Sequence, residues 1–128
     1  MKNLTLVLLW IVVAAHVGFM GIEMFPPKRP LVFDQVSLGF KPPSNEMTAA
    51  PIVQNAGLYN GFLAAGLIWG IRSRRNAFGL RVFFLTCAIV AGIFGYFTLT
   101  HTTLLLQTVP GALALGAVLA TGQIERGN

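Results

Sequence analysis

Four apolar stretches of 19 to 23 residues run through the chain, and they constrain its fold more than any other feature. They cover Leu4–Met24, Pro51–Ile71, Phe78–Thr100 and Thr103–Thr121. About 20 residues of helix, rising 1.5 Å each, are needed to cross the hydrocarbon core of a bilayer. Only helices and closed barrels can cross, because backbone groups find no water in lipid, and these stretches lack the alternation of barrel strands. The sequence therefore predicts four transmembrane helices.

The composition favours burial in lipid over a soluble fold. Hydrophobic residues make up 55% and charged residues 10% of the 128 residues, whereas about 25% of residues are charged in a typical soluble domain. A soluble domain of this size has too much surface for its volume to hide so much apolar area. We therefore expect residues 1–128 to form one all-α domain, an antiparallel up-down bundle of four transmembrane helices surrounded by the lipid bilayer.

The basic residues predict the orientation of this bundle. Arg72, Arg74 and Arg75 lie in the connector between the second and third stretches, and Arg81 follows just beyond it. The positive-inside rule places this connector, and with it both termini, in the cytoplasm. The placement of these basic residues within the net charge of +5 therefore indicates membrane orientation, and we expect a multi-pass protein of the inner (plasma) membrane. Nucleic-acid binding is not expected, because it needs a basic face with interleaved polar groups.

The segment 25–50 then forms a loop on the outer side. It contains five of the seven prolines, which prevent a continuous helix, together with short apolar runs. We expect it to fold back over the bundle or to dip into the membrane interface. Two starts of the second helix are open. Pro51 is an early helical residue, where its missing N–H costs nothing, or the helix starts near Ser44 and is kinked at Pro51.

Small residues recur at a spacing of four along the second and third helices. The pairs are Gly57 and Gly61, Gly66 and Gly70, Ala88 and Gly92, and Ala91 and Gly95. Such pairs let helix backbones approach closely, and close packing drives association inside lipid. We expect tight helix contacts within the bundle, although the same spacing permits a homo-oligomer.

Most polar residues of the apolar stretches fall in the outer half of the predicted bundle. Five of them are candidate ligand-binding residues: His16 and Glu23 on the first helix, and Asn55, Tyr59 and Asn60 on the second. Polar groups in lipid are costly, so they are functional candidates. His16 and Glu23 share a helix face but lie about 10 Å apart along its axis. We expect a polar pocket that opens toward the outer loop, in which His16 or Glu23 lies within hydrogen-bonding distance of Asn55, Tyr59 or Asn60, directly or through a water or ligand. Asn55 and Tyr59 are the best placed to bridge the two.

Each of these residues also has a structural interpretation. Glu23 would pair at the interface with Lys28 or Arg29, and a neutral His16 would bond to a neighbouring helix. The polar residues of the second helix, such as Tyr59, would hold helices together, at about 1 kcal/mol per hydrogen bond. The sequence does not identify catalytic residues. The sequence has no metal-binding pair, phosphate-binding glycine loop, CxxC or GxSxG motif, so we expect neither a metal ion nor a cofactor.

At the second helix the sequence resembles a known family. Residues 54–70, QNAGLYNGFLAAGLIWG, are similar to the signature of the domain-of-unknown-function family 1304. In that family the signature follows a first helix ending in a His…Glu-Met-Phe pattern, which here is His16…Glu23-Met24-Phe25. The resemblance covers nearly the whole chain. It implies a small four-helix integral membrane protein without an established activity and names no substrate.

Three functions fit these observations. The first is a polar pocket that binds, and transports or senses, a small amphipathic molecule. The second is an intramembrane enzyme acting on a lipid-soluble substrate, with His16 and Glu23 as an acid–base pair. The third is an accessory subunit that packs through its glycine faces against a larger membrane complex. We expect the first.

Overall fold

The computed structural model is all-helical over the residues it describes, which are 2–25, 46–98 and 101–126, with side chains for 2–25, 51–98 and 101–122. Its helices are α1 (Lys2–Met24), α2 (Glu46–Arg72), α3 (Ala77–Thr98) and α4 (Val109–Arg126), the last preceded by a π-helical segment, η2 (Leu104–Thr108). The predicted folding of the loop around residues 26–45 lies outside the described residues.

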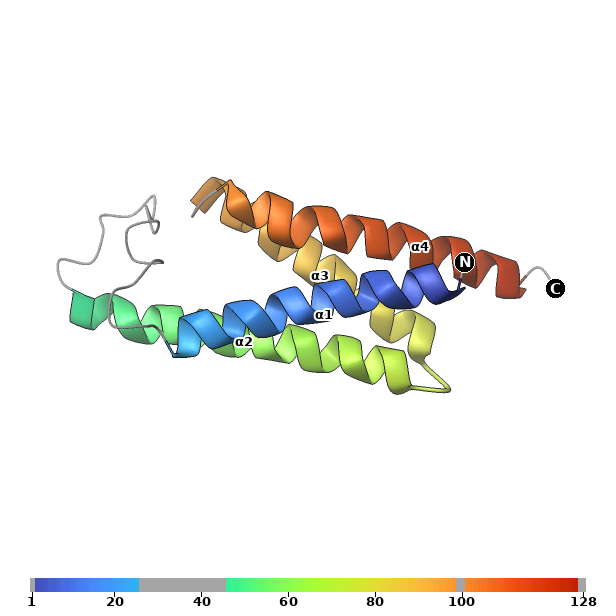
Figure 1. Ribbon diagram of the computed structural model, residues 1–128, viewed down its shortest axis with the longest axis horizontal. Helices are drawn as coiled ribbons and strands as arrows, with labels where there is room; N and C mark the ends of the chain where they lie inside the picture. Colours follow the sequence, from blue (N-terminus) through green and yellow to red (C-terminus); the bar gives the residue numbers. More distant parts are fainter. Residues whose placement is uncertain (1, 26–45, 99–100, 127–128) are drawn as a thin grey trace.

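Consecutive helices run in opposite directions (Figure 1). The beginning of α1 and the end of α4 lie at the same end of the bundle as the connector from α2 to α3. We name this the basic end, because Lys2, Arg72 and Arg81 belong to it. The opposite end, where α1 finishes at Met24 and α3 at Thr98, is named the loop end.

Each helix packs against two others around a single core. α1 contacts α2 and α4, and α3 contacts the same two helices. The core cluster of buried apolar residues consists of Leu9, Val12, Val13, Ala64, Leu67, Leu85, Ala114 and Val118. Their mixture of large and small side chains lets the helices approach closely, and close packing holds helices together where lipid is as apolar as the core.

The outer surface of the bundle is apolar on every side. Large hydrophobic side chains are exposed on each helix, for example Trp10 on α1, Phe62 on α2, Phe94 on α3 and Leu113 on α4. Soluble monomers rarely expose contiguous apolar surface of this extent. Three described stretches are long and apolar enough to cross a membrane, namely α1, α3 and residues 104–122. These features suggest a membrane protein.

The helix α2 differs from the other three. It is not among the stretches apolar enough to cross a membrane by composition, and its first half carries Gln54, Asn55 and Asn60. It begins at Glu46 with Pro51 inside the helix, so the earlier of the two predicted starts agrees with the structure. Gly57 lies against Glu23 and Met24, the last residues of α1. The turns of α2 before Gly57 therefore extend beyond the end of α1 (Figure 1).

Buried glycines bring the helices into contact, as their spacing predicted. Gly61 faces α1, Gly66 faces α3, and Gly92 faces η2. A Cβ atom added to Gly66 would overlap the ring of Phe84, and one added to Gly92 would lie 2.9 Å from the backbone nitrogen of Thr108. Because neither position has room for a side chain, the glycines set the distance between these helices.

The π-helical segment η2 ends at Thr108, two residues before Pro110. A proline inside a helix lacks the N–H that would bond to the carbonyl four residues earlier, and its ring clashes with that carbonyl. In η2 the bonds reach one residue further back, as from the Val109 N–H to the Leu104 oxygen. Local π turns of this kind re-satisfy the backbone groups that a proline frees in a membrane helix. The predicted single helix 103–121 is therefore continued through the proline by a change of helix type.

Candidate functional site

Two of the five predicted residues meet at the loop end. Asn60 Nδ2 donates a hydrogen bond of 2.8 Å to Glu23 Oε2, and Asn60 is 9% exposed. Gly57 permits this contact, because a Cβ atom there would lie 2.9 Å from the Cβ of Glu23. The last turn of α1 therefore rests on the backbone of α2, beside the amide. The structure thus contains a polar contact between the first two helices, through Asn60 rather than Asn55 or Tyr59.

His16 lies deeper in the bundle and is completely buried. Its Nδ1 is 2.8 Å from the carbonyl oxygen of Val12, one turn earlier on α1. Since a carbonyl only accepts, Nδ1 carries the proton of the neutral ring, and Nε2 is an acceptor. Nε2 is buried and has no hydrogen-bond partner among the residues that the structure describes. Leaving such an atom unsatisfied costs about 1–3 kcal/mol, so it needs a specific explanation.

His16 and Glu23 do not touch each other. Glu23 is bonded to Asn60, and His16 is bonded to the carbonyl of Val12. The seven residues between them correspond to about 10 Å of rise along α1. The described residues therefore contain no direct acid–base pair of the kind that the enzyme hypothesis uses.

Asn55 and Tyr59 lie on a different face of α2 from Asn60. Both side chains are exposed, and the Tyr59 ring packs edge-on against Phe62 with centroids 6.0 Å apart. Successive helical residues are rotated by about 100° around the helix axis. Tyr59, one residue before Asn60, and Asn55, five residues before it, therefore point away from the side that faces α1. Neither residue bridges the two predicted groups of α1. Their expected place in a pocket between the helices is corrected by this rotation.

Polar residues of α3 and η2 at the loop end make contacts with each other. Thr108 Oγ1 donates to the carbonyl oxygen of Ile89 over 3.5 Å, which joins η2 to α3. The ring centroids of Tyr96 and His101 are 4.9 Å apart. These contacts hold α3 against the start of the last helix. They do not extend to the bond between α1 and α2, so the polar residues of the four helices form separate groups in the described part of the chain.

The described residues also offer no ready metal centre. Within ranges 2–25, 51–98 and 101–122, no three His, Cys, Asp or Glu side chains are grouped so that they would hold a metal ion. The single cysteine, Cys87, is a free thiol on α3.

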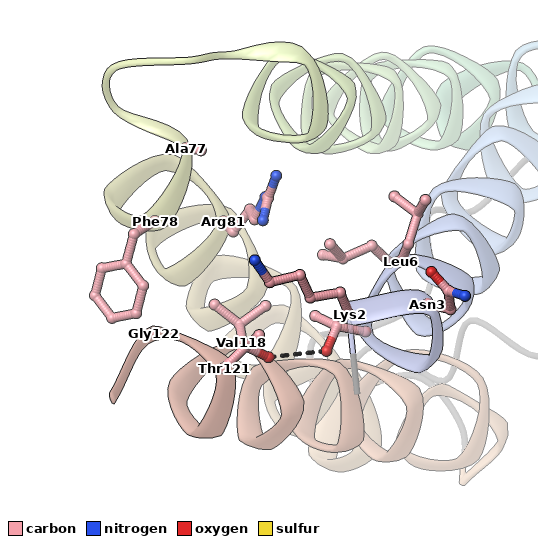
Figure 2. A pocket seen from close by; sticks show the side chains of 11 residues that line it. Lys2, Asn3, Leu6, Ala77, Phe78, Arg81, Val118, Thr121 and Gly122 are labelled. Atoms are coloured by element: carbon pink, nitrogen blue, oxygen red, sulfur yellow. Dashed lines mark hydrogen bonds between the residues drawn. The ribbon is translucent and has the colours of Figure 1, made fainter. Parts of the chain in front are cut away.

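A cavity lies at the basic end, opposite to the predicted pocket. Its volume is about 330 Å³, and α1, α3 and α4 line it with residues that include Lys2, Thr5, Arg81 and Thr121 (Figure 2). The arginines predicted the orientation of the bundle, but the sequence did not predict this cavity. Polar residues near both ends of the chain could have indicated it, because an up-down bundle of four helices brings the two chain ends together.

By its fold, the chain is a small all-helical protein in which three of the described helical stretches are long and apolar enough to cross a membrane. The chain belongs to the family described as protein of unknown function DUF1304, whose model matches residues 10–119. The predicted resemblance is thereby confirmed. The match includes all five predicted site residues and leaves out Lys2, Thr5 and Thr121 at the basic end. No curated protein and no solved structure matches the chain.

Proposed function

We propose that this protein spans the inner membrane four times, with both termini in the cytoplasm, and binds a small amphipathic molecule between its helices. The ligand would lie in the half of the bundle that holds His16, Glu23 and Asn60. Binding there would serve transport or sensing of the molecule.

The position of α2 in the bundle supports the fourth span. α2 packs between α1 and α3, as a full member of the bundle. Its outer face exposes Leu58, Phe62 and Trp69, which suit contact with lipid. The polar residues Gln54 and Asn55 belong to the turns that extend beyond α1, where they would reach the membrane interface. The arginines of the basic end favour the cytoplasm for that end.

The observation that carries the proposed binding function is the unsatisfied Nε2 of His16. The bond to Val12 makes Nε2 an acceptor, so a ligand would satisfy it with a hydroxyl, an amine or a protonated acid. Such a hydrogen bond would remove the cost of about 1–3 kcal/mol that the empty acceptor imposes on the protein. This cost gives a ligand with a donor group an advantage over a purely apolar molecule.

The surroundings of His16 favour a ligand that is polar at one end and apolar at the other. On the side of the loop end lies the bonded pair of Glu23 and Asn60. On the side of the basic end lies the apolar core, including Leu9 and Val12. A molecule at the level of His16 would therefore present its polar group to the loop end and its apolar part to the core or to lipid.

The test is native mass spectrometry of the gently solubilised protein, with the variant His16→Leu. We expect the wild-type protein to retain a low-mass adduct that is not protein, and His16→Leu to lose it. The variant should melt at the same temperature or higher, because it removes an unsatisfied polar atom, while the carbonyl of Val12 keeps its helical hydrogen bond.

Asn55→Leu is the matched control, since it makes an equally apolar change on the exposed face of α2. It should retain the adduct. A wild-type protein without any adduct, or an adduct that survives His16→Leu, would contradict the binding function. A stoichiometric protein partner in place of the adduct would put the accessory-subunit hypothesis first.

A further inference from the structure

We propose that the molecule bound at His16 is an uncharged alcohol, with a hydroxyl group on an otherwise apolar chain or ring. The hydroxyl would donate its hydrogen to Nε2, and the apolar body would lie along the helices. This proposal rests on the binding function proposed above, and it narrows the three possible donors, a hydroxyl, an amine and a protonated acid, to the first. Three features of the bundle favour a hydroxyl: the depth of His16, the placement of the charged residues and the packing beside the ring.

His16 lies far from both ends of α1. Met24, the last residue of the helix, follows it by eight residues, and Lys2, the first, precedes it by fourteen. At 1.5 Å per residue these separations are about 12 Å and about 21 Å. In a helix that spans a hydrocarbon core about 30 Å thick, both distances place the imidazole inside the core, away from water. The described residues supply no donor to Nε2, so a molecule that dissolves in lipid is its source.

The four helices bring no charged group to the depth of His16. Their apolar stretches contain two charged residues, Glu23 at the end of α1 and Arg81 near the beginning of α3. Glu23 is about 10 Å from His16 along α1. Arg81 lies at the basic end, where its Nε donates to the carbonyl oxygen of Gly70 over 2.9 Å. An ammonium or a carboxylate at Nε2 would therefore find no counter-charge on the helices, and an unpaired charge is costly at this depth.

Amines and acids are rarely uncharged at neutral pH, whereas an alcohol carries no charge there. An alkyl ammonium with an ordinary pKa of about 10.4 is neutral in about one molecule in 2,500 at pH 7, and a carboxylic acid with a pKa of about 4.3 in about one in 500. A ligand that binds only in its neutral form loses apparent affinity by the same factor. A hydroxyl is therefore the donor that reaches Nε2 without this loss.

The groups beside the imidazole are apolar, as the body of such an alcohol requires. The Phe19 ring stands edge-on to the imidazole, with centroids 6.2 Å apart. Val12 and Val13, both buried, lie one turn nearer to the basic end. Small-molecule sites are mostly apolar, with a few polar groups that fix the orientation of the ligand. Here Nε2 would be the polar group, and it accepts a single hydrogen bond.

The interface between α1 and α2 offers a route from the loop end to His16. Met20 lies on it between His16 and Glu23, since residues three and four positions apart share a helix face. Its sulfur would be 2.8 Å from a Cβ atom added to Gly61, so the thioether fills the space that this glycine leaves. A methionine side chain is unbranched and adapts to what it contacts. Rotation of Met20 would therefore admit an alkyl chain without moving a helix backbone.

The test compares four probes of equal chain length: 1-dodecanol, dodecyl methyl ether, dodecylamine and dodecanoic acid. The full chain is solubilised at pH 7 in lauryldimethylamine oxide, a detergent without a hydroxyl group. The rise in melting temperature with the mole fraction of each probe in the micelle measures its affinity. We expect 1-dodecanol to bind about tenfold more tightly than each other probe, because the ether lacks the donor and the other two are charged.

His16→Leu should abolish this preference, so that 1-dodecanol and the ether bind with affinities within about twofold of each other. Asn55→Leu is the matched control, because it makes an equally apolar change on the exposed face of α2. It should keep the tenfold preference. The comparison of alcohol with ether in the wild-type chain needs no variant, so it decides the matter even where His16→Leu does not fold.

Failure of the alcohol and failure of the binding function give different results. Tighter binding of the amine or the acid, lost in His16→Leu, would overturn the alcohol and leave the binding function in place. Equal affinities of alcohol and ether in the wild-type chain would do the same, provided that His16→Leu still loses the native adduct. An alcohol preference that survives in His16→Leu would show that the hydroxyl binds elsewhere, and both proposals would fall.

Discussion

The two ends of the bundle differ in where their polar side chains lie. At the loop end, Glu23, Asn60 and His16 are withdrawn between helices. At the basic end, Lys2 and Arg81 line an open cavity. Within a bilayer, a polar group finds partners only in the protein, whereas water and headgroups are available at an interface. A buried polar residue of the loop end therefore needs an internal partner, and His16 Nε2 is the exception among the described residues.

The family match divides the chain in a similar way. It spans residues 10–119 and so contains the polar residues of the loop end completely, but only part of the cavity at the basic end. The function proposed for the loop end is thus a proposal about the matched region. The cavity at the basic end is lined partly by Lys2, Thr5 and Thr121, which lie outside the match.

The largest expected effect concerns the side of the membrane on which each end lies. In a Cys87→Ala background, Ser73→Cys at the basic end should react with a membrane-impermeant maleimide only from the cytoplasm. His101→Cys, in the exposed turn at the loop end, should react only from outside. The reason is that a charged reagent cannot cross the hydrocarbon core. Reaction of both from the same side would overturn the four-span topology, and mixed reaction of each would indicate two orientations.

The next largest effect is the loss of stability when a glycine at a helix contact is replaced by alanine, compared between the two ends. Gly57→Ala at the loop end should lower the free energy of unfolding by about 1–3 kcal/mol through overpacking. Its Cβ would lie 2.9 Å from that of Glu23 and 3.1 Å from the backbone nitrogen of Met24. Gly70→Ala at the basic end should cost less, because its closest contacts, 3.1 Å to Cγ and 3.2 Å to the backbone nitrogen of Arg81, are longer than the 2.9 Å contact at Gly57.

Gly116→Ala is the control for both, since nothing lies within 4 Å of its added Cβ. It should be neutral or stabilise the helix by about 0.5–1 kcal/mol, because alanine loses less backbone entropy than glycine. Thermal unfolding in detergent measures all three variants. If Gly70→Ala cost as much as Gly57→Ala, the loop end would not be the more tightly packed of the two.

A smaller effect is expected when the polar contact of the loop end is broken. Asn60→Leu leaves the half-buried carboxylate of Glu23 without its partner, which should cost about 1–3 kcal/mol in unfolding free energy. Adding Glu23→Gln should recover part of the loss, because a neutral amide is cheaper to leave unpaired than a carboxylate. A double-mutant cycle by thermal unfolding measures the coupling. Additive losses would show that the hydrogen bond contributes nothing to stability.

The smallest effect is expected for the hydroxyl pair of the basic end. Thr5→Val removes the contact of 3.0 Å with Thr121, and hydrogen bonds between membrane helices contribute about 0.6 kcal/mol on average. Thr86→Val is the control, because the exposed Thr86 hydroxyl bonds to Val82 of its own helix. Unfolding in detergent should distinguish the two variants. A loss at Thr5 larger than that at Asn60 would reverse the proposed difference between the ends.

The sequence by itself determined the number of helices, their approximate lengths and the apolar surface. These follow from runs of apolar residues and from spacing along one helix, which are local properties of the chain. The close contacts at Gly61, Gly66 and Gly92 were predictable for the same reason, since small residues one turn apart mark a face that a neighbouring helix can approach. The π turn before Pro110 was not predicted, because helix type depends on how the neighbouring carbonyls are satisfied.

Only the tertiary structure decided which polar residues meet. Asn55, Tyr59 and Asn60 are equally polar candidates in the sequence, but the rotation of α2 against α1 turns only Asn60 toward Glu23. The cavity between Lys2 and Arg81 likewise depends on helices that are distant in the sequence. Rotation and register of a helix are set by packing against all its neighbours, so a pattern read along one helix does not contain them. The same packing buries His16 completely and leaves its Nε2 without a hydrogen-bond partner in the described part of the chain.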